Sequence, residues 1–149
     1  MKRIYNTGFE VEPRIILIAG NYPSDSFSED MFVALDFMAV YGHEFLETMQ
    51  NLHGDNGFKF SEITARRQVV RESIRKLVLK GFLNVSTDNG FKYSISSIGK
   101  QYSDSFESSY AIQYKRNLVD IYQYFSSYDE QRLYSMICAK TVKEGGEGQ

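Results

Sequence analysis

Apolar residues recur three or four positions apart along most of the chain, which is the spacing of amphipathic helices. Residues that cap or break helices bound five such stretches. The predicted helices run from near Glu10 to Gly20–Pro23, from the capping-box pattern Ser26-Phe27-Ser28-Glu29 to Gly42, from near Ser61 to Gly81, from Ile98–Phe106 through a Tyr-rich stretch to Tyr128, and onward from the cap Asp129. The sequence therefore predicts a mainly helical protein.

One segment follows the period of two that is typical of strands. Residues 82–86 and 91–96 alternate in polarity on either side of Thr87-Asp88-Asn89-Gly90. Asn-Gly is a strong signal for a tight hairpin turn, and Gly81 is suited to end the preceding helix. A β-hairpin that follows a basic helix indicates a recognition helix and its wing.

The helix from Ser61 to Gly81 carries most of the positive charge. Residues 64–80 hold six basic side chains and one acid, Glu72, so this stretch is +5 within a chain of net charge −2. Its apolar face, which we expect to pack on the second helix, consists of Ile63, Val70, Ile74, Leu77 and Val78. Local charge on a mildly acidic chain points to a functional surface.

Arg67 differs from the other basic residues of this helix. It falls about 40° from Ile63 by the 3.6-residue period, inside the core-facing sector. A guanidinium in that place needs a carboxylate or several carbonyls as partners. We therefore predict that Arg67 is structural or interfacial, with Asp36, Asp55 or Glu62 as candidate partners.

The remaining basic residues of the helix are expected at the surface. Arg66 and Arg71 flank the apolar face on opposite sides, while Arg75, Lys76 and Lys80 point outward. Val69 and Leu79 also point away from that face, which suits a protein partner better than phosphate. Contact with DNA and docking of a protein both remain open at this point.

Composition narrows the functional classes. The chain has 149 residues, of which 42% are apolar and 15% aromatic, enough for one core. The single cysteine excludes an internal disulfide, and two histidines exclude a histidine-rich metal site. No apolar run approaches membrane-spanning length, and the first residues lack the hydrophobic region of a signal peptide, so we expect a cytoplasmic protein.

Catalytic chemistry has little support in the sequence. The two histidines and the cysteine lie in different predicted elements, and no nucleophile-elbow, phosphate-loop or dinucleotide-binding motif is present. His53-Gly54-Asp55-Asn56 could ligate an ion, but a tight turn explains the same residues. We expect no enzyme activity, cofactor or metal.

Six short motifs, in this order and spacing, resemble the small middle component of bacterial ABC-three-component systems, a family that includes the accessory subunit of Lamassu-type anti-phage defence. They are F-E-x-E-x-R-I-I-L from Phe9, A-L-D-F from Ala34, N-L-H-G-D-N from Asn51, A-R-R-x-x-V from Ala65, L-x-x-K-G-F from Leu77 and S-S-Y-A-x-x-Y from Ser108. The resemblance covers about residues 4–125.

The resemblance implies a non-enzymatic subunit that joins an SMC/Rad50-like ABC ATPase to an effector, often a nuclease. Direct contact with double-stranded DNA is left open, and no membrane is involved. The alternative from another class is a stand-alone winged-helix transcription regulator that dimerises through its long C-terminal helix.

The predicted fold is mainly α (α+β), a winged helix-turn-helix with a two-stranded wing and a C-terminal helical extension. Residues 1–106 form the winged-helix domain, 107–140 the extension packed on it and 141–149 a disordered tail. Candidates for binding DNA or an acidic partner are Arg66, Arg71, Arg75, Lys76, Lys80 and Lys92. Candidates for a subunit interface are Val69, Leu79, Tyr110, Tyr114, Leu118, Tyr122 and Phe125, and Asp36, Asp55 and Arg67 are expected to be structural.

Overall fold

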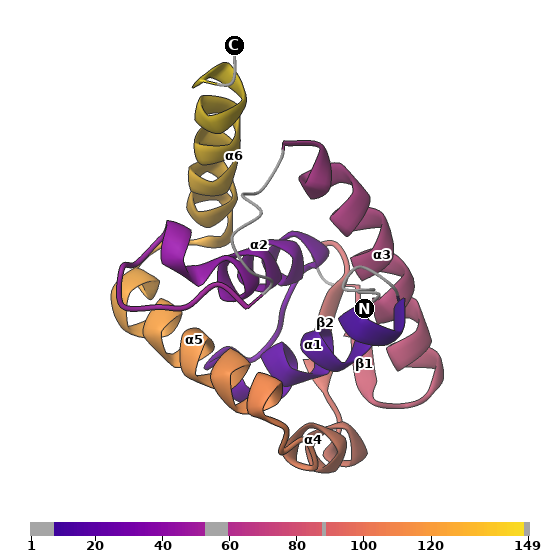
Figure 1. Cartoon of the computed structure of the whole chain (residues 1–149). Coiled ribbons are helices and arrows are strands. Elements are labelled where there is room, and N and C mark those ends of the chain that lie inside the picture. Colours follow the sequence, from indigo (N-terminus) through magenta and orange to yellow (C-terminus); the bar gives the residue numbers. More distant parts are fainter. Residues whose placement is uncertain (1–7, 53–59, 88, 148–149) are drawn as a thin grey trace.

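The computed structural model describes residues 8–52, 60–87 and 89–147. Within them the protein is mainly helical with one small antiparallel sheet, as predicted (Figure 1). The elements are α1 (Gly8–Asn21), α2 (Glu29–Val40), the 3₁₀ turn η1 (Gly42–Glu44), α3 (Phe60–Leu79), β1 (Leu83–Ser86), β2 (Lys92–Ile95), α4 (Ser97–Asp104), α5 (Ser109–Phe125) and α6 (Glu130–Glu147).

Helix α2 lies at the centre of the fold. Every residue from Phe32 to Val40 is buried, because this stretch is apolar on all sides except at Asp36. Helices α1, α3, α5 and α6 all pack against it (Figure 1). The helix is capped by Ser28, inside the predicted capping-box pattern but two residues after its first serine; the Ser28 side-chain oxygen accepts a hydrogen bond of 3.1 Å from the Met31 amide.

The end of α3 fixes where the hairpin starts. Gly81 has a φ of 83°, a left-handed conformation that favours glycine. The Gly81 amide bonds the Val78 carbonyl at 3.0 Å and the Phe82 amide bonds the Leu77 carbonyl at 2.9 Å. This pair of bonds is a Schellman motif, which stops the helix and turns the chain directly into β1.

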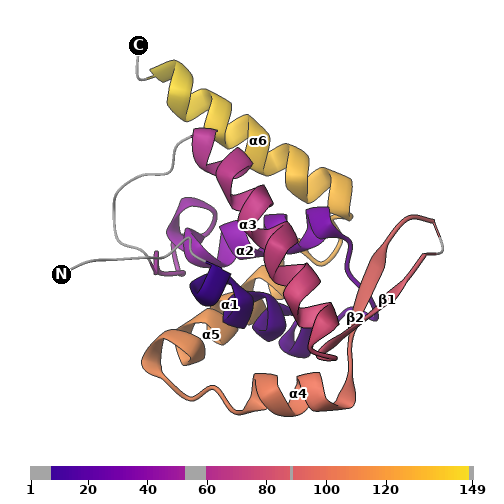
Figure 2. The same ribbon diagram turned by 90° about the vertical axis from the view of Figure 1, so that its right-hand side faces the viewer.

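Strands β1 and β2 form the predicted hairpin, which projects from the helical body (Figure 2). Leu83 pairs with Ile95 and Ser86 with Lys92, and Asn89 and Gly90 have φ values of 55° and 88°, as an Asn-Gly turn requires. Phe27, just before α2, adds a bridge to Tyr93 through two backbone hydrogen bonds of 2.8 Å. The hairpin is therefore attached to the helical body at two places. One is the Phe27 segment, which precedes α2 in the sequence, and the other is the end of α3, which follows α2.

Two predictions about the C-terminal region were wrong. The helix expected to run on from Ile98–Phe106 is two helices, because Ser108 caps α5 by accepting a hydrogen bond of 3.1 Å from the Ala111 amide. Serines compete for backbone hydrogen bonds and so favour helix ends over helix interiors. The tail expected to be disordered from residue 141 is helical as far as Glu147, because α6, which Asp129 caps as predicted, continues through it.

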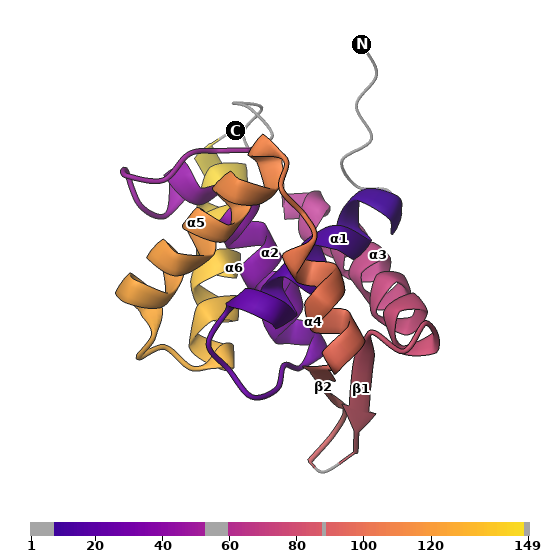
Figure 3. The same cartoon turned by 90° about the horizontal axis from the view of Figure 1, so that it is seen from below.

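Helices α5 and α6 share the core of the preceding helices. Tyr114, Leu118 and Ile121 of α5, and Leu133 and Ile137 of α6, belong to the same cluster of buried residues as α1 and α2. Seen from below, α4 lies beside α1 and the hairpin, and α5 packs against α1 and α2 (Figure 3). The segment between α4 and α5 thus connects two helices that both pack against α1.

Candidate functional site

A buried ionic network links α1, α2, α3 and α5. Asp36 of α2 accepts hydrogen bonds from Arg14 at 2.8 and 3.0 Å, from Arg66 at 2.6 Å and from the Tyr114 hydroxyl at 2.6 Å. All four side chains are at most 1% exposed. Asp36, which was expected to be structural, is thus buried and bonded to three side chains from three other helices.

The network sets the charge state of Asp36. Burial by itself raises the pKa of a carboxyl, but the charges of Arg14 and Arg66 and the hydrogen bonds from Arg14 and Tyr114 outweigh it. They hold the pKa of Asp36 well below its ordinary value. Two guanidinium groups therefore share one ionised, buried carboxylate.

Arg66 was predicted to lie at the surface and to contact DNA or an acidic partner, and this was wrong. It is 1% exposed, and its guanidinium carbon lies 5.4 Å from the Phe37 ring centroid and 5.8 Å from that of Tyr41. The physical reason is that α3 packs on both α1 and α2, so its buried face is wider than its apolar face and includes the polar residues Arg66 and Ser73. A helical wheel centred on the apolar residues counts these two positions as exposed.

Arg67 is half-buried and paired, but not with the predicted acids. Its guanidinium lies 2.8 Å from Glu29 and 2.6 Å from Asp30, both at the start of α2. It also lies over the Tyr134 ring of α6, at 5.1 Å from the centroid. Of the partners predicted from sequence, Asp36 pairs with Arg14 and Arg66 instead, Asp55 lies outside the described residues, and the side chain of Glu62 is not described.

Two more basic residues of α3 are paired within the chain. Arg71 forms two hydrogen bonds of 3.0 Å with Glu29, and Lys80 lies 2.9 Å from Glu12 of α1. Burial raises the pKa of Glu29, but its hydrogen bonds with Arg71 and Arg67 outweigh that effect and lower it. Four of the six cations of the basic stretch, Arg66, Arg67, Arg71 and Lys80, therefore already have an acid of this chain as partner.

Arg75 and Lys76 are the two remaining cations of this stretch. Both are exposed, and neither has an ion-pair partner among the residues that the structure describes. Lys92 of β2 likewise has no ion pair with any described residue, and its side chain is half-buried. The free positive charge on this face is thus much smaller than the sequence suggests.

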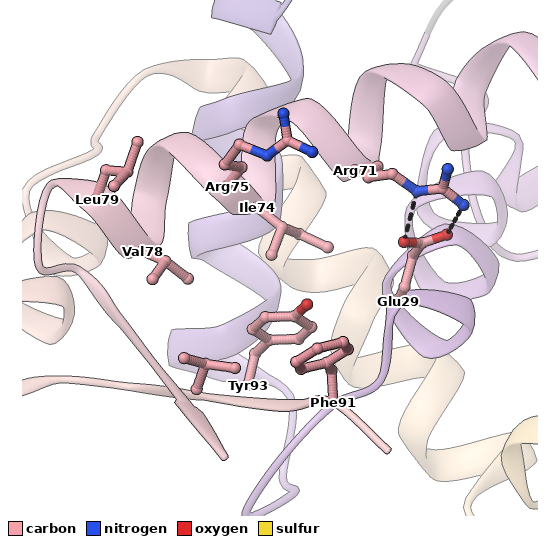
Figure 4. A pocket seen from close by; sticks show the side chains of 9 residues that line it. Glu29, Arg71, Ile74, Arg75, Val78, Leu79, Phe91 and Tyr93 are labelled. Atoms are coloured by element: carbon pink, nitrogen blue, oxygen red, sulfur yellow. Dashed lines mark hydrogen bonds and ion pairs between the residues drawn. The ribbon is translucent and has the colours of Figure 1, made fainter. Parts of the chain in front are cut away.

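A groove lies between the second half of α3 and the hairpin (Figure 4). We call it the α3–hairpin groove; it has a volume of about 390 Å³ and is lined by Glu29, Arg71, Ile74, Arg75, Val78, Leu79, Val85, Phe91 and Tyr93. Three of its apolar side chains are strongly exposed: Leu79 at 80%, Phe91 at 63% and Val85 at 45%. An exposed apolar surface with a charged rim is typical of a protein-docking site.

Comparison with protein-family models shows to which family the chain belongs. The model described as ABC-three component (ABC-3C) system Middle Component 2 matches residues 4–147, nearly the whole chain. The chain belongs to this family. No curated protein and no solved structure matches it. The resemblance seen in the sequence motifs is confirmed, and the middle component is an accessory member of a multi-component system.

The predicted interface on the Tyr-rich helix of the middle component needs correction. Tyr114 and Leu118 are completely buried and Phe125 is 9% exposed, because these residues form the core face of α5. Tyr110 is half-buried and stacks on Tyr114, with ring centroids 6.2 Å apart. Tyr122 does reach the surface, although its ring also meets that of Tyr22 at 5.5 Å.

Several functional candidates of the middle component were missed in the sequence. Phe91 and Val85 line the α3–hairpin groove, and Ile112 and Val119 form an exposed apolar face on α5. Phe91 had a usable signal, since an aromatic residue directly after an Asn-Gly turn lies at the tip of a hairpin. Val69 was expected to be exposed beside Leu79, but it is half-buried and packs against the core.

Other classes of site find no geometric support in the described part of the middle component. There, no group of three His, Cys, Asp or Glu side chains is placed to hold a metal ion. No helix among the described residues is long and apolar enough to cross a membrane. The α3–hairpin groove therefore remains the best candidate for a functional site.

Proposed function

We propose that this middle component is a non-enzymatic adaptor of a cytoplasmic anti-phage and anti-plasmid defence complex, joining an SMC/Rad50-like ABC ATPase to an effector nuclease. The observation that carries the proposal is the contrast on α3. Most of its basic side chains are paired within the chain, whereas the adjoining apolar groove is open. A surface of this kind favours protein docking over the reading of a base sequence.

We further infer that the fold is a winged helix used for protein contact. The order α1, the Phe27 bridge segment, α2, α3, β1 and β2 supports this, because the single-residue bridge from Phe27 to Tyr93 pairs with the hairpin on the β2 side. In this arrangement α3 stands where a DNA-binding winged helix has its recognition helix. Here three of its arginines, Arg66, Arg67 and Arg71, pair with acids of α2 instead.

Contact with double-stranded DNA is at most a secondary role in this proposal. Phosphate contacts depend on unpaired Lys and Arg side chains, and each contact adds to the salt dependence of binding. On α3, Arg75 and Lys76 are the described cations left for such contacts, with Lys92 on the hairpin nearby. Any DNA held by the assembled complex would then be bound mainly by other subunits.

Co-expression with the neighbouring ATPase and effector genes tests the adaptor role. We expect the three chains to co-purify as one complex, and the effector to be lost from the ATPase when the middle component is omitted. Assembly of ATPase and effector to the same extent without it would overturn the proposal. A homodimer of the isolated chain that binds a specific duplex would instead identify a transcription regulator.

A further inference from the structure

The α3–hairpin groove has an apolar floor and apolar walls. Ile74 and Val78 of α3 face Tyr93 of β2 across it (Figure 4). Leu79, Val85 and Phe91 form the walls and keep much of their surface in contact with water. Burying one Leu or Phe side chain is worth on the order of 1.5–3 kcal/mol, so covering these residues would be strongly favourable.

The charges that line the groove do not balance. Glu29 is the one acidic residue among the lining residues described, and Arg71 and Arg67 already satisfy both its oxygens. Arg75, on the opposite part of the lining, has no ion-pair partner among the described residues. A ligand with a carboxylate near Arg75 would balance the charge of this arginine, because Arg binds carboxylates through two parallel hydrogen bonds.

We propose that the α3–hairpin groove binds a short amphipathic segment of another subunit of the same system. That segment presents at least two large apolar side chains, which contact Leu79 and Phe91, next to an Asp or Glu that pairs with Arg75. This inference rests on the proposed adaptor function and adds the chemistry of the partner. Apolar anchors at a spacing matched to a groove are a common mode of peptide recognition.

Protein is favoured over DNA as the occupant of the groove. Duplex DNA offers phosphates to Arg75 but little apolar surface to bury Leu79, Val85 and Phe91 together. One unpaired guanidinium supplies only a small part of the electrostatic attraction on which DNA affinity depends. The apolar area, more than the charge, therefore decides which class of macromolecule binds.

Charge reversal at two adjacent residues gives a matched test. Arg75→Glu places a carboxylate in the groove, while Lys76→Glu makes the same change in charge on an exposed residue outside the lining. In complexes assembled with the co-expressed ATPase and effector, we expect R75E to weaken binding of one subunit at least about tenfold and K76E to change it less than about threefold. Equal effects of the two variants would overturn the proposal.

The apolar walls are tested by Leu79→Asp combined with Phe91→Asp. Both side chains are largely exposed, so the variant should fold, and circular dichroism with thermal unfolding of the isolated chain checks this. We expect the double variant to lose the same subunit that R75E loses. Binding equal to wild type in a folded L79D/F91D variant would contradict the proposal.

Photo-crosslinking supplies a measurement that does not depend on a destabilising change. With benzoylphenylalanine at position 91, we expect crosslinks to one partner segment that contains large apolar residues and an Asp or Glu; position 76 is the control. Crosslinks from position 91 to DNA alone, or R75E weakening DNA binding while subunit binding stays intact, would show that the occupant is nucleic acid and overturn the proposal.

Failure of this inference and failure of the adaptor function give different results. If the wild-type chain assembles with no other subunit, the adaptor function is overturned, and the groove inference with it. If the wild-type chain assembles normally and R75E and L79D/F91D do so equally well, only the groove inference is overturned.

Discussion

Two adjacent arginines of α3 have different surroundings. Arg66 is buried beside the Phe37 and Tyr41 rings and shares the Asp36 carboxylate with Arg14, whereas Arg67 is half-exposed between α2 and α6. Both are paired, but only the first is deprived of water. Removing an acid should therefore cost far more at Asp36 than at an acid on the surface.

Asp36→Asn should strongly destabilise the fold. The substitution keeps the size of the side chain but removes the buried carboxylate that Arg14 and Arg66 share, which costs about 3–5 kcal/mol. Asp30→Asn, on the same helix, removes a more exposed partner of Arg67 and should cost at most about 1 kcal/mol. Urea unfolding monitored by circular dichroism measures both, and a D36N cost no larger than that of D30N would contradict the role of the network.

Acid should destabilise the protein through the same carboxylate. Because the pKa of Asp36 is lower in the folded than in the unfolded state, its stabilising contribution is complete above its unfolded pKa of about 4 and is lost as the pH falls below it. Glu29, whose pKa is also lowered, acts in the same direction. The free energy of unfolding should fall between about pH 5 and pH 3, and less steeply in D36N than in wild type; equal slopes would assign the acid sensitivity elsewhere.

At the scale of elements, the hairpin is held at its base by close packing against α4. An added Cβ at Gly99 of α4 would overlap the Phe82 carbonyl and lie 3.0 Å from Ile95. The Phe82 carbonyl also accepts a hydrogen bond from the Ser96 amide at 3.1 Å, so the backbone there has little freedom to move. The orientation of the hairpin, and with it the α3–hairpin groove, depends on this contact.

Gly99→Ala should therefore displace the base of the hairpin. We expect a loss of about 1–3 kcal/mol from overpacking, together with faster hydrogen exchange at the Ser96 amide. Ser97→Ala, on the exposed side of the same helix, is the matched control and should leave both quantities nearly unchanged. Unchanged exchange at Ser96 in G99A would show that the base of the hairpin does not depend on this contact.

For the whole molecule, charge is mostly balanced within the chain. The basic stretch of α3 contacts acids from α1 and α2, so its local charge of +5 is largely compensated in the folded protein. A net charge of −2 then leaves little long-range attraction for DNA. The isolated chain should therefore bind nucleic acid more weakly than the assembled complex does.

The isolated chain should bind duplex DNA weakly and with a shallow salt dependence. With Arg75 and Lys76 as the cations left on α3, the slope of log K against log salt should be about −2. Fluorescence anisotropy with a labelled duplex at several salt concentrations measures it. A slope steeper than about −5 would mean that the ion pairs of α3 open for DNA.

Most of the elements follow from local patterns. The helical spacing of apolar residues, the cap Asp129 and the Asn-Gly turn were predicted and are found at those positions, while the predicted capping-box pattern contains the observed cap Ser28. Short motifs that are spread in a fixed order along most of the chain also indicated the family. The break at Ser108 was missed because Phe106 and Tyr110 keep the helical spacing across it.

The sequence by itself determined the elements, the hairpin and the absence of recognised catalytic motifs, because periodicity, capping and turn preferences act over a few residues. Only the tertiary structure decided that Arg66 is buried, that Glu29 pairs with Arg67 and Arg71, and that Phe91 and Leu79 line the same groove. Each of these contacts joins residues that are distant in sequence. Their pairing depends on how helices cross, which a single helical wheel does not contain.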